Sequence, residues 1–383
     1  MSDKEDLVAR YRYGAQYVTD YAEFRRQVLN KTIVPHQVEV QPASPSKEIC
    51  WLKCPWCYGL SANDTGERLS RDRAVEVMRQ IAAGGVRKVI FAGYATDPLN
   101  CLYLEDLLEV AIDNGQVFGF NTKAIKASDR LLELLATTGI APKSYLSVSV
   151  DAGSNDVFNV SHAVTNEKAR IYDRILKNVE HIAAARARGG ASFDISATYL
   201  INATNNSPHE VAAFIRDFRS AGCNLLRFTF PQVPRSFVPA AGIIPSKQDV
   251  QSYTESLRTS IEAESTEECT VLFVDADSSH GIFDKPRTVP CFARFIYPTV
   301  GFDGWLYHCS QSSAPNFRSM ALGNLATHDF WDLYYNYDAD NLAEYFEGCA
   351  TKMAAAGCRC DRKEHIVNST VLASGAFKEL STL

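Results

Sequence analysis

Short apolar strands alternate with helical segments along the middle of this 383-residue chain, and this alternation restricts the possible folds more than any other feature. Six segments have the length and the apolar or β-branched character of buried strands, and each is followed by a turn and a helical pattern. Such units predict an α/β fold, a partial (β/α)6 TIM-like barrel with functional loops at the carboxyl ends of its strands. The predicted strands are residues 38–41, 89–93, 117–121, 145–152, 193–201 and 225–230.

Apolar stripes and capping residues mark several of the helices between these strands. Apolar residues repeat at helical spacing over residues 104–111, and leucines do so again over 131–135. The run Ser-Pro-His-Glu that starts at Ser207 predicts a helix start, in which Ser207 caps the helix and Glu210 reaches back to the cap.

Three cysteines follow the first predicted strand at the spacing Cys50-x3-Cys54-x2-Cys57. A tetrahedral metal site normally takes four protein ligands, and an iron–sulfur cubane has four irons to satisfy. Three thiolates so close together therefore suggest a cluster with one iron left open, where a substrate or cofactor binds. The alternative is a zinc site that borrows a distant fourth Cys or His.

The other cysteines of the eleven fall into an isolated set and a grouped set. Cys101, Cys223 and Cys269 are isolated, and each is expected to be a small buried hydrophobic residue. The grouped set lies in the last quarter of the chain, where a small aromatic domain would need a metal to hold it together. It consists of Cys291, Cys309, Cys349, Cys358 and Cys360.

The strand–helix alternation gives way to other patterns in the last third of the chain. Residues 295–308 predict an antiparallel hairpin with a type I′ turn at Asp303-Gly304, and Pro298 confines its first strand to a sheet edge. A helix beginning at Ser246 and a strand at 271–277 are expected before it. The predicted domains are an N-terminal helical extension (1–35), the partial barrel (36–245), a linker helix and strand (246–290) and a C-terminal α+β domain (291–383).

Composition excludes several classes of function. The net charge of −6 argues against a nucleic-acid or membrane-surface binder, because phosphate contact needs clustered Lys and Arg. The chain has no signal-peptide core and no apolar run long enough to span a membrane. We therefore expect a cytoplasmic protein that binds neither nucleic acid nor membrane.

The segment from Cys50 to Cys57, with the aromatic Trp56 directly before the third cysteine, resembles the signature of the radical S-adenosylmethionine (SAM) enzymes. The resemblance covers roughly residues 36–235. It implies a 4Fe–4S cluster held by the three cysteines, with SAM bound to the open iron. Cleavage of SAM by one electron from flavodoxin or ferredoxin would give a 5′-deoxyadenosyl radical that abstracts hydrogen from the substrate.

The same resemblance implies SAM contacts at the ends of the strands. Gly93 corresponds to a glycine-rich turn that meets the SAM amino group, although the usual second glycine is missing and the nearest acid is Asp97. Ser149-Val150-Asp151 corresponds to a Ser-x-Asp pattern near SAM. Each polar residue taken alone is equally a turn or capping residue. The implied cofactor-binding residues are Trp56, Tyr58, Gly93, Asp97, Asn121, Thr122, Ser149, Asp151 and Ser196.

The C-terminal cysteines resemble the auxiliary-cluster domains of this superfamily, called SPASM when complete and twitch when shortened. A second 4Fe–4S cluster ligated by Cys291, Cys309, Cys358 and Cys360 is implied, and Cys349 either replaces one of them or is a bystander. A zinc site is the alternative. The second cluster would accept an electron in a net oxidation, or else staple the domain while the reaction is a redox-neutral rearrangement, epimerisation or elimination.

The substrate is expected to be a small molecule rather than a ribosomal peptide. Only 49 residues precede Cys50, and they show no complete leader-binding domain of the kind that many peptide-modifying relatives carry. A peptide maturase stays an alternative, as does a non-catalytic iron–sulfur or zinc protein. Candidates for catalysis or substrate contact are Arg227, Gln232, Asp275, Asp277, His280 and Tyr297.

Overall fold

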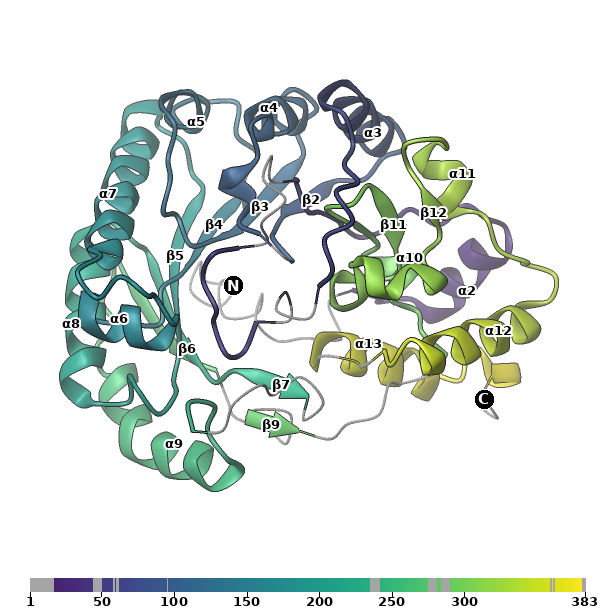
Figure 1. The fold of residues 1–383 in the computed structure, drawn as a ribbon. Coiled ribbons are helices and arrows are strands. Elements are labelled where there is room, and N and C mark those ends of the chain that lie inside the picture. The colour runs from purple at the N-terminus through teal and green to yellow at the C-terminus, as the bar shows by residue number, and fades with distance from the viewer. Residues whose placement is uncertain are drawn as a thin grey trace. The chain divides into compact units, whose positions relative to one another are not determined.

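The computed structural model describes residues 17–43, 50–57, 59, 62–94, 96–234, 242–274, 281–283, 290–358, 360 and 362–380. They belong to two compact units, each built from segments that are distant in sequence (Figure 1). The central unit comprises Ser44–Ser61 and Ala95–Asp284. The terminal unit comprises Met1–Ala43, Ala62–Tyr94 and Lys285–Leu383.

A parallel sheet forms the middle of the central unit. Its order is β3-β4-β5-β6-β8, so strand order follows chain order. The helix and strand expected as a linker are present, and β8 pairs with β6 and so extends this sheet. The strands are β3 (Val117–Thr122), β4 (Tyr145–Ser149), β5 (Asp194–Leu200), β6 (Leu225–Thr229) and β8 (Thr270–Phe273), and β7 (Gln232–Pro234) pairs separately with β9 (Gly281–Phe283).

Helices cover one face of the central sheet (Figure 1). Alternate residues of each strand, such as Phe120, Val148 and Phe228, are fully buried beneath them. The intervening residues, such as Ser147 and Thr198, are polar and point to the opposite face. The helices are α4 (Leu104–Asp113), α5 (Asp129–Leu135), α6 (Asn155–Ser161), α7 (Ile171–Gly189), α8 (Pro208–Ser220) and α9 (Lys247–Glu262).

The terminal unit joins strands from both ends of the chain into one sheet. β10 (Thr299–Val300) pairs in parallel with β1 (Val38–Val40), which pairs in parallel with β2 (Lys88–Phe91). β11 (Trp305–Tyr307) and β12 (Gly323–Asn324) continue the sheet beyond β10 in antiparallel fashion. The helices are α2 (Tyr21–Leu29), α3 (Arg71–Ala83), α10 (Ala293–Ile296), α11 (Phe330–Tyr334), α12 (Leu342–Ala355) and α13 (Arg362–Ala373).

The predicted C-terminal hairpin is present, but three of its details were wrong. Its first part is helix α10 rather than strand. The chain reverses over residues 301–304 instead of in a type I′ turn centred on Asp303-Gly304: the Gly304 amide donates to the Gly301 carbonyl at 2.9 Å, and Gly304 has a φ of +81°. β10 is not an edge strand, because it lies between β1 and β11. Pro298 is tolerated since it precedes the strand and uses only its carbonyl, which accepts from the Glu39 amide at 3.1 Å.

Helix α8 begins as predicted, except for the role of its glutamate. Ser207 accepts from the Glu210 amide at 3.2 Å and so caps the helix. The Glu210 carboxylate does not reach back to the cap, because it accepts from the Gly153 amide at 2.9 Å and from the Ser154 hydroxyl. The cap expected at Ser246 is confirmed as a full capping box with Asp249.

No helix in the described part of the chain is both long and apolar enough to cross a membrane.

Candidate functional site

The three early cysteines lie close together on one loop of the central unit. Cys54 is buried, Cys50 and Cys57 are half-buried, and none forms a disulfide. The Cys57 amide donates to the Cys54 carbonyl at 3.0 Å, which closes a turn between them. The Lys53 amide donates to the His162 carbonyl at 3.1 Å and so attaches the loop to the end of α6.

A buried network of Lys123, Asp151 and His162 belongs to the same unit. The Lys123 ammonium lies 2.9 Å from Asp151 Oδ2 and 2.7 Å from His162 Nε2. Asp151 is completely buried, and its second oxygen accepts from the Leu200 amide at 2.8 Å. Lys123 follows β3 and Asp151 follows β4, so the network gathers at the carboxyl ends of parallel strands, where α/β folds place their ligands.

Charge in this network is balanced by pairing rather than by water. Burial is the largest influence on the Asp151 carboxylate and acts against it, but Lys123 and His162 together outweigh it and hold the pKa of Asp151 at about 2. Burial is also the largest influence on Lys123 and acts against its charged form, but Asp151, Cys54 and Cys57 together outweigh it, so the pKa of Lys123 is raised. Burial, followed by the neighbouring Lys123, lowers the pKa of His162, which therefore stays neutral near pH 7.

Lys123 also affects the pKa of Cys54 in the cysteine loop. Burial raises the pKa of the Cys54 thiol to about 12, and Lys123 is the largest influence in the opposite direction. A bound cluster would supply positive charge that stabilises the thiolates, since metal ligation requires deprotonated cysteine. Three thiols beside a fixed cation therefore fit the donor set of an iron–sulfur cluster.

Aromatic rings pack the cysteine loop against the end of α6. The ring of Trp56 meets that of His162 edge to face at 5.6 Å between centroids, and Phe158 stacks on His162 at 4.0 Å. Trp56, predicted to line the cofactor site, thus packs on His162. Sequence reasoning missed Lys123 and His162, because neither belongs to a recognisable motif, although Lys123 directly follows the polar end of the third predicted strand.

Asp97 and Thr122, both predicted as cofactor contacts, bind one another. The Thr122 hydroxyl donates to Asp97 at 2.7 Å, and the amides of Lys123 and Leu99 donate to it at 2.6 and 2.9 Å. Asp97 thereby ties the loop after β2 to the end of β3. Gly93 lies in the terminal unit, after β2.

The remaining predicted contacts lie in a polar row across the central sheet. Asn121 pairs in register with Ser147, and Ser147 with Ser196; Ser149 pairs with Thr198, and Thr198 with Arg227. Asn121 is exposed, Ser149 is half-buried and Ser196 is buried. The Arg227 guanidinium donates to Thr198 at 3.4 Å. Gln232 begins β7. Tyr58, Asp275, Asp277 and His280 lie outside the described residues.

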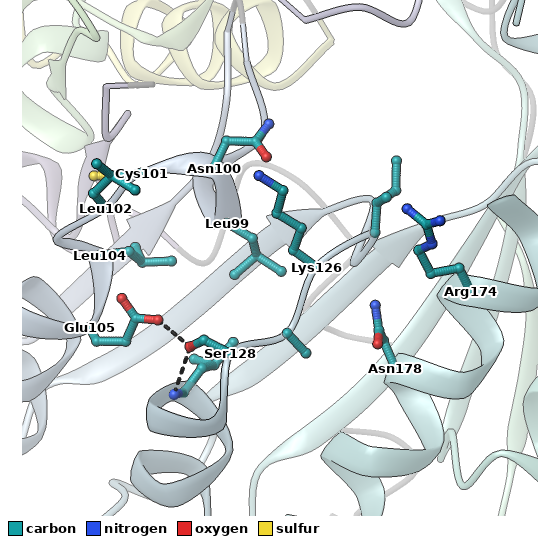
Figure 2. Close-up of a pocket in the computed structure, with 13 residues that line it drawn as sticks. Leu99, Asn100, Cys101, Leu102, Leu104, Glu105, Lys126, Ser128, Arg174 and Asn178 are labelled. Carbon is teal, nitrogen blue, oxygen red and sulfur yellow. Dashed lines mark hydrogen bonds between the residues drawn. The ribbon is translucent and has the colours of Figure 1, made fainter. Parts of the chain in front are cut away.

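The central unit contains a cavity of about 550 Å³, and Leu99, whose amide donates to Asp97, lies in its wall (Figure 2). It is bounded by the segment after Pro98, the loop after β3 and the start of α7, which contributes Arg174 and Asn178. Its wall contains the Ser128 hydroxyl, which donates to Glu105. None of the predicted site residues lines it.

Four of the five late cysteines form a buried group in the terminal unit. Burial raises the pKa of Cys291 well above its ordinary value, and Cys360 and Cys358 add to this. Burial also raises the pKa of Cys309 well above its ordinary value, and Glu364, Cys291 and Cys358 raise it further. Each thiol of the group is less than a tenth exposed.

Cys349 stands apart from this group. Burial raises the pKa of Cys349, and the neighbours that act on it are Arg294 and Lys352 rather than other thiols. Among the described residues, no three His, Cys, Asp or Glu side chains are grouped as around a single metal ion. The four thiols fit a cubane, whose cysteines bind different irons, and the one-by-one match to Cys291, Cys309, Cys358 and Cys360 remains a prediction.

Comparison with known proteins bears on these sites. Residues 45–215 match the model of the radical SAM superfamily. An S-adenosylmethionine-dependent nucleotide dehydratase from Lacinutrix mariniflava is 28% identical over 138 residues, which are 33% of this chain. The matched part of the chain spans 28% of that relative's length.

Solved structures share the fold at low sequence identity. Streptococcus suis SuiB bound to S-adenosylmethionine has a TM-score of 0.57 at 15% identity, covering 82% of this chain and 69% of SuiB. The enzyme anSMEcpe with bound AdoMet has a TM-score of 0.52 at 13% identity, covering 91% of this chain and 98% of its own. The predicted α/β fold of the partial-barrel type is thereby confirmed.

Proposed function

Because residues 45–215 match the model of the radical SAM superfamily, we propose that this protein reductively cleaves S-adenosylmethionine and abstracts hydrogen from a small-molecule substrate. The observation that carries the proposal is the loop of Cys50, Cys54 and Cys57 in this segment, where a turn joins Cys54 to Cys57 and the Lys123 ammonium opposes the raised pKa of Cys54. When bound, the 4Fe–4S cluster supplies the electron that breaks a carbon–sulfur bond of SAM.

The chain's own residues divide the work of holding the two cofactors. Cys50, Cys54 and Cys57 would hold the cluster. The Lys123 ammonium, fixed by Asp151, favours the thiolate form of Cys54 and so favours cluster binding. The half-buried Trp56 limits access of water to the loop, which protects a radical from being quenched.

SAM itself would meet the polar row of the central sheet. Asn121 and Ser149 display exposed or half-buried polar groups on the face opposite the helices, where a ribose can replace water as hydrogen-bond partner. Ser196 and Asp151 are more deeply buried and would support them. Asp97 and Thr122 are proposed to shape the loop edge of the same site, and contact of Gly93 with the SAM amino group stays a prediction.

We propose a net oxidation assisted by a second 4Fe–4S cluster on Cys291, Cys309, Cys358 and Cys360. Their burial in one group supports this ligand set, and the position of Cys349 beside Arg294 supports its exclusion. The donor of the initial electron would be flavodoxin or ferredoxin. A cytoplasmic location suits this reduced chemistry, because cytosolic thiols stay reduced.

A second candidate is a redox-neutral elimination, which the similarity to a nucleotide dehydratase favours. In that case the buried cysteine group would only hold the terminal unit together. Peptide modification is a further alternative, since SuiB has been solved with its precursor peptide SuiA.

Anaerobic reconstitution with iron and sulfide, followed by SAM and dithionite, tests the proposal. We expect 5′-deoxyadenosine from the wild type and none from Cys54→Ser, while Cys101→Ser, a change at an isolated buried cysteine, should behave as the wild type. The Cys358→Ala/Cys360→Ala variant should still form 5′-deoxyadenosine.

The product separates the two candidates once a substrate is at hand. If the reaction is a net oxidation, the Cys358→Ala/Cys360→Ala variant should no longer form the oxidised product. If the reaction is an elimination, the same variant should still form the elimination product. A fully iron-loaded wild type that forms no 5′-deoxyadenosine would contradict both.

A further inference from the structure

A group of buried charged side chains occupies one face of the sheet in the terminal unit. Glu39 on β1 and Thr299 on β10 are register partners, and Gln41 follows Glu39 on the same face. Helix α13 adds Lys363 and Glu364, with the Lys363 ammonium 4.2 Å from the centre of the Tyr297 ring. Glu39, Tyr297, Lys363 and Glu364 are named the Glu364 cluster here.

The Glu364 cluster contains two carboxyl groups and one ammonium group. Glu364 is 1% exposed and Glu39 is 8% exposed, so both carboxyl groups are removed from water. The Lys363 ammonium lies 3.6 Å from Glu364 Oε1. Burial is the largest influence on Lys363 and acts against its charged form, but Glu364, Tyr17, Glu39 and Cys309 together outweigh it and the pKa of Lys363 is raised. Burial raises the pKa of Glu39, with Lys363 acting in the opposite direction, so a further cation beside Glu39 would favour its ionised form.

Several buried oxygen atoms of this region lack a hydrogen-bond partner within the described residues. They include both carboxylate oxygens of Glu364 and the Tyr297 hydroxyl. A buried polar atom without a partner costs folding free energy, and a buried carboxylate costs more than a neutral group. The further atoms are Thr299 Oγ1 on β10 and Gln41 Oε1, although the Gln41 amide nitrogen donates to Glu39 at 3.0 Å.

These atoms define the ligand that would satisfy them. All of these oxygens can accept a hydrogen bond, so the ligand must donate several, and a cationic ligand would also favour the ionised form of Glu39, which burial alone disfavours. Water could donate but would not favour that ionised form. A bare metal ion is disfavoured because no three acidic, His or Cys side chains of the described chain are grouped around one point. A protonated amine meets both demands.

We propose that the Glu364 cluster binds an organic ammonium group. Glu364 and Glu39 supply the charge, the Tyr297 hydroxyl orients the ammonium hydrogens, and Lys363 offsets one of the two negative charges. The ligand is a small organic amine, and this inference does not depend on the proposed function. Tyr297, suggested by the sequence as a catalytic candidate, acts here as a binding residue.

Thermal unfolding of the anaerobically reconstituted protein tests this site with ethylammonium chloride as the probe. Sodium chloride at equal ionic strength and ethylene glycol serve as ligand controls. Ethylammonium should raise the wild-type melting temperature above both controls, because a ligand that binds only the folded state stabilises it. Glu364→Gln keeps the shape and removes the charge, and should weaken the apparent affinity at least about tenfold.

Two further variants guard against a fold defect in Glu364→Gln. Lys363→Met removes the competing cation, so it should bind ethylammonium more tightly than the wild type, a gain that a misfolded protein would not show. Glu347→Gln changes an exposed acid on α12 of the same unit and should bind as the wild type. Equal shifts in wild type and Glu364→Gln, or a wild-type shift no larger than that with sodium chloride, would overturn the proposal.

The outcome is separable from that of the proposed function. Loss of the ethylammonium shift in Glu364→Gln, together with no 5′-deoxyadenosine from the loaded wild type, keeps the amine site and rejects the radical reaction. Formation of 5′-deoxyadenosine with equal shifts in both proteins rejects the amine site alone.

Discussion

At Asp151 the chain places a fully buried carboxylate on a residue with a φ of +61°, a backbone conformation that costs a non-glycine residue free energy. The side chain repays that cost by joining three elements. One oxygen accepts from the Leu200 amide of β5, and the other pairs with Lys123 after β3 and with His162 at the end of α6. Asp151 is therefore a positioning residue behind the cysteine loop.

We expect Asp151→Asn to lower the free energy of unfolding by about 3–5 kcal/mol, since it leaves the buried Lys123 ammonium without its counter-charge. Urea unfolding monitored by circular dichroism measures this change. The matched control is Asp173→Asn, which removes an exposed pair with Arg170 and should cost less than about 1 kcal/mol. A loss at Asp151 no larger than at Asp173 would show that the network is not a stabilising ion pair.

The difference in free energy of unfolding between the wild type and Asp151→Asn should depend on pH, and the direction of that dependence follows from the pKa of Asp151. Burial opposes the Asp151 carboxylate most strongly, but Lys123 and His162 together outweigh it, so its folded pKa of about 2 lies below the ordinary value of 3.8. A carboxyl group of this kind stabilises the fold above its unfolded pKa, and the contribution disappears as pH falls toward the folded pKa. The gap between wild type and Asp151→Asn should therefore narrow from about pH 4 to about pH 2, and a constant gap would contradict the pairing.

At the scale of elements, helix α8 is fixed to the loop after β4 by close backbone contact. Gly153 lies so near the first turn of α8 that an added Cβ would come within 2.1 Å of the Glu210 carbonyl oxygen. The Glu210 carboxylate accepts from Gly153 and Ser154 across the same contact. This contact holds the segment that carries Asp151 against the rest of the sheet.

Gly153→Ala should therefore destabilise the central unit by about 1–3 kcal/mol, because the added methyl group meets backbone rather than a flexible side chain. Gly348→Ala on α12 is the control, since no atom lies within 4 Å of its added Cβ. That substitution should stabilise by up to about 1 kcal/mol through helix propensity. Urea unfolding of both variants measures the difference, and equal effects would mean that α8 does not pack as described.

At the scale of the whole molecule, sequence patterns predicted those features that depend on local periodicity. The six strands were predicted within a few residues, since each apolar run is buried on one face of a sheet. The hairpin after residue 295 was predicted, but the edge position predicted for its first strand was wrong, because pairing of β10 with β1 joins residues far apart in sequence. The cap at Ser246 was predicted correctly, whereas Glu210 follows a tertiary contact instead of its local motif.

The candidate sites divide in the same way. Cysteine spacing indicated the loop at Cys50–Cys57, and the structure supplies Lys123 and His162 beside it. The role of those two residues could not be inferred from the sequence, because it depends on the ends of β3, β4 and α6 lying close together in the fold. The Glu364 cluster could not be predicted from the sequence either, because Glu39 and Glu364 come from opposite ends of the chain.

The central claim is that Cys50, Cys54 and Cys57 leave one iron open for SAM. Electron paramagnetic resonance of the dithionite-reduced Cys358→Ala/Cys360→Ala variant tests it most directly, because only the first cluster should then contribute. Iron analysis should give about four irons per chain, one cubane. We predict that adding SAM changes the spectrum of that cluster. An unchanged spectrum in a protein with full iron content would contradict the claim.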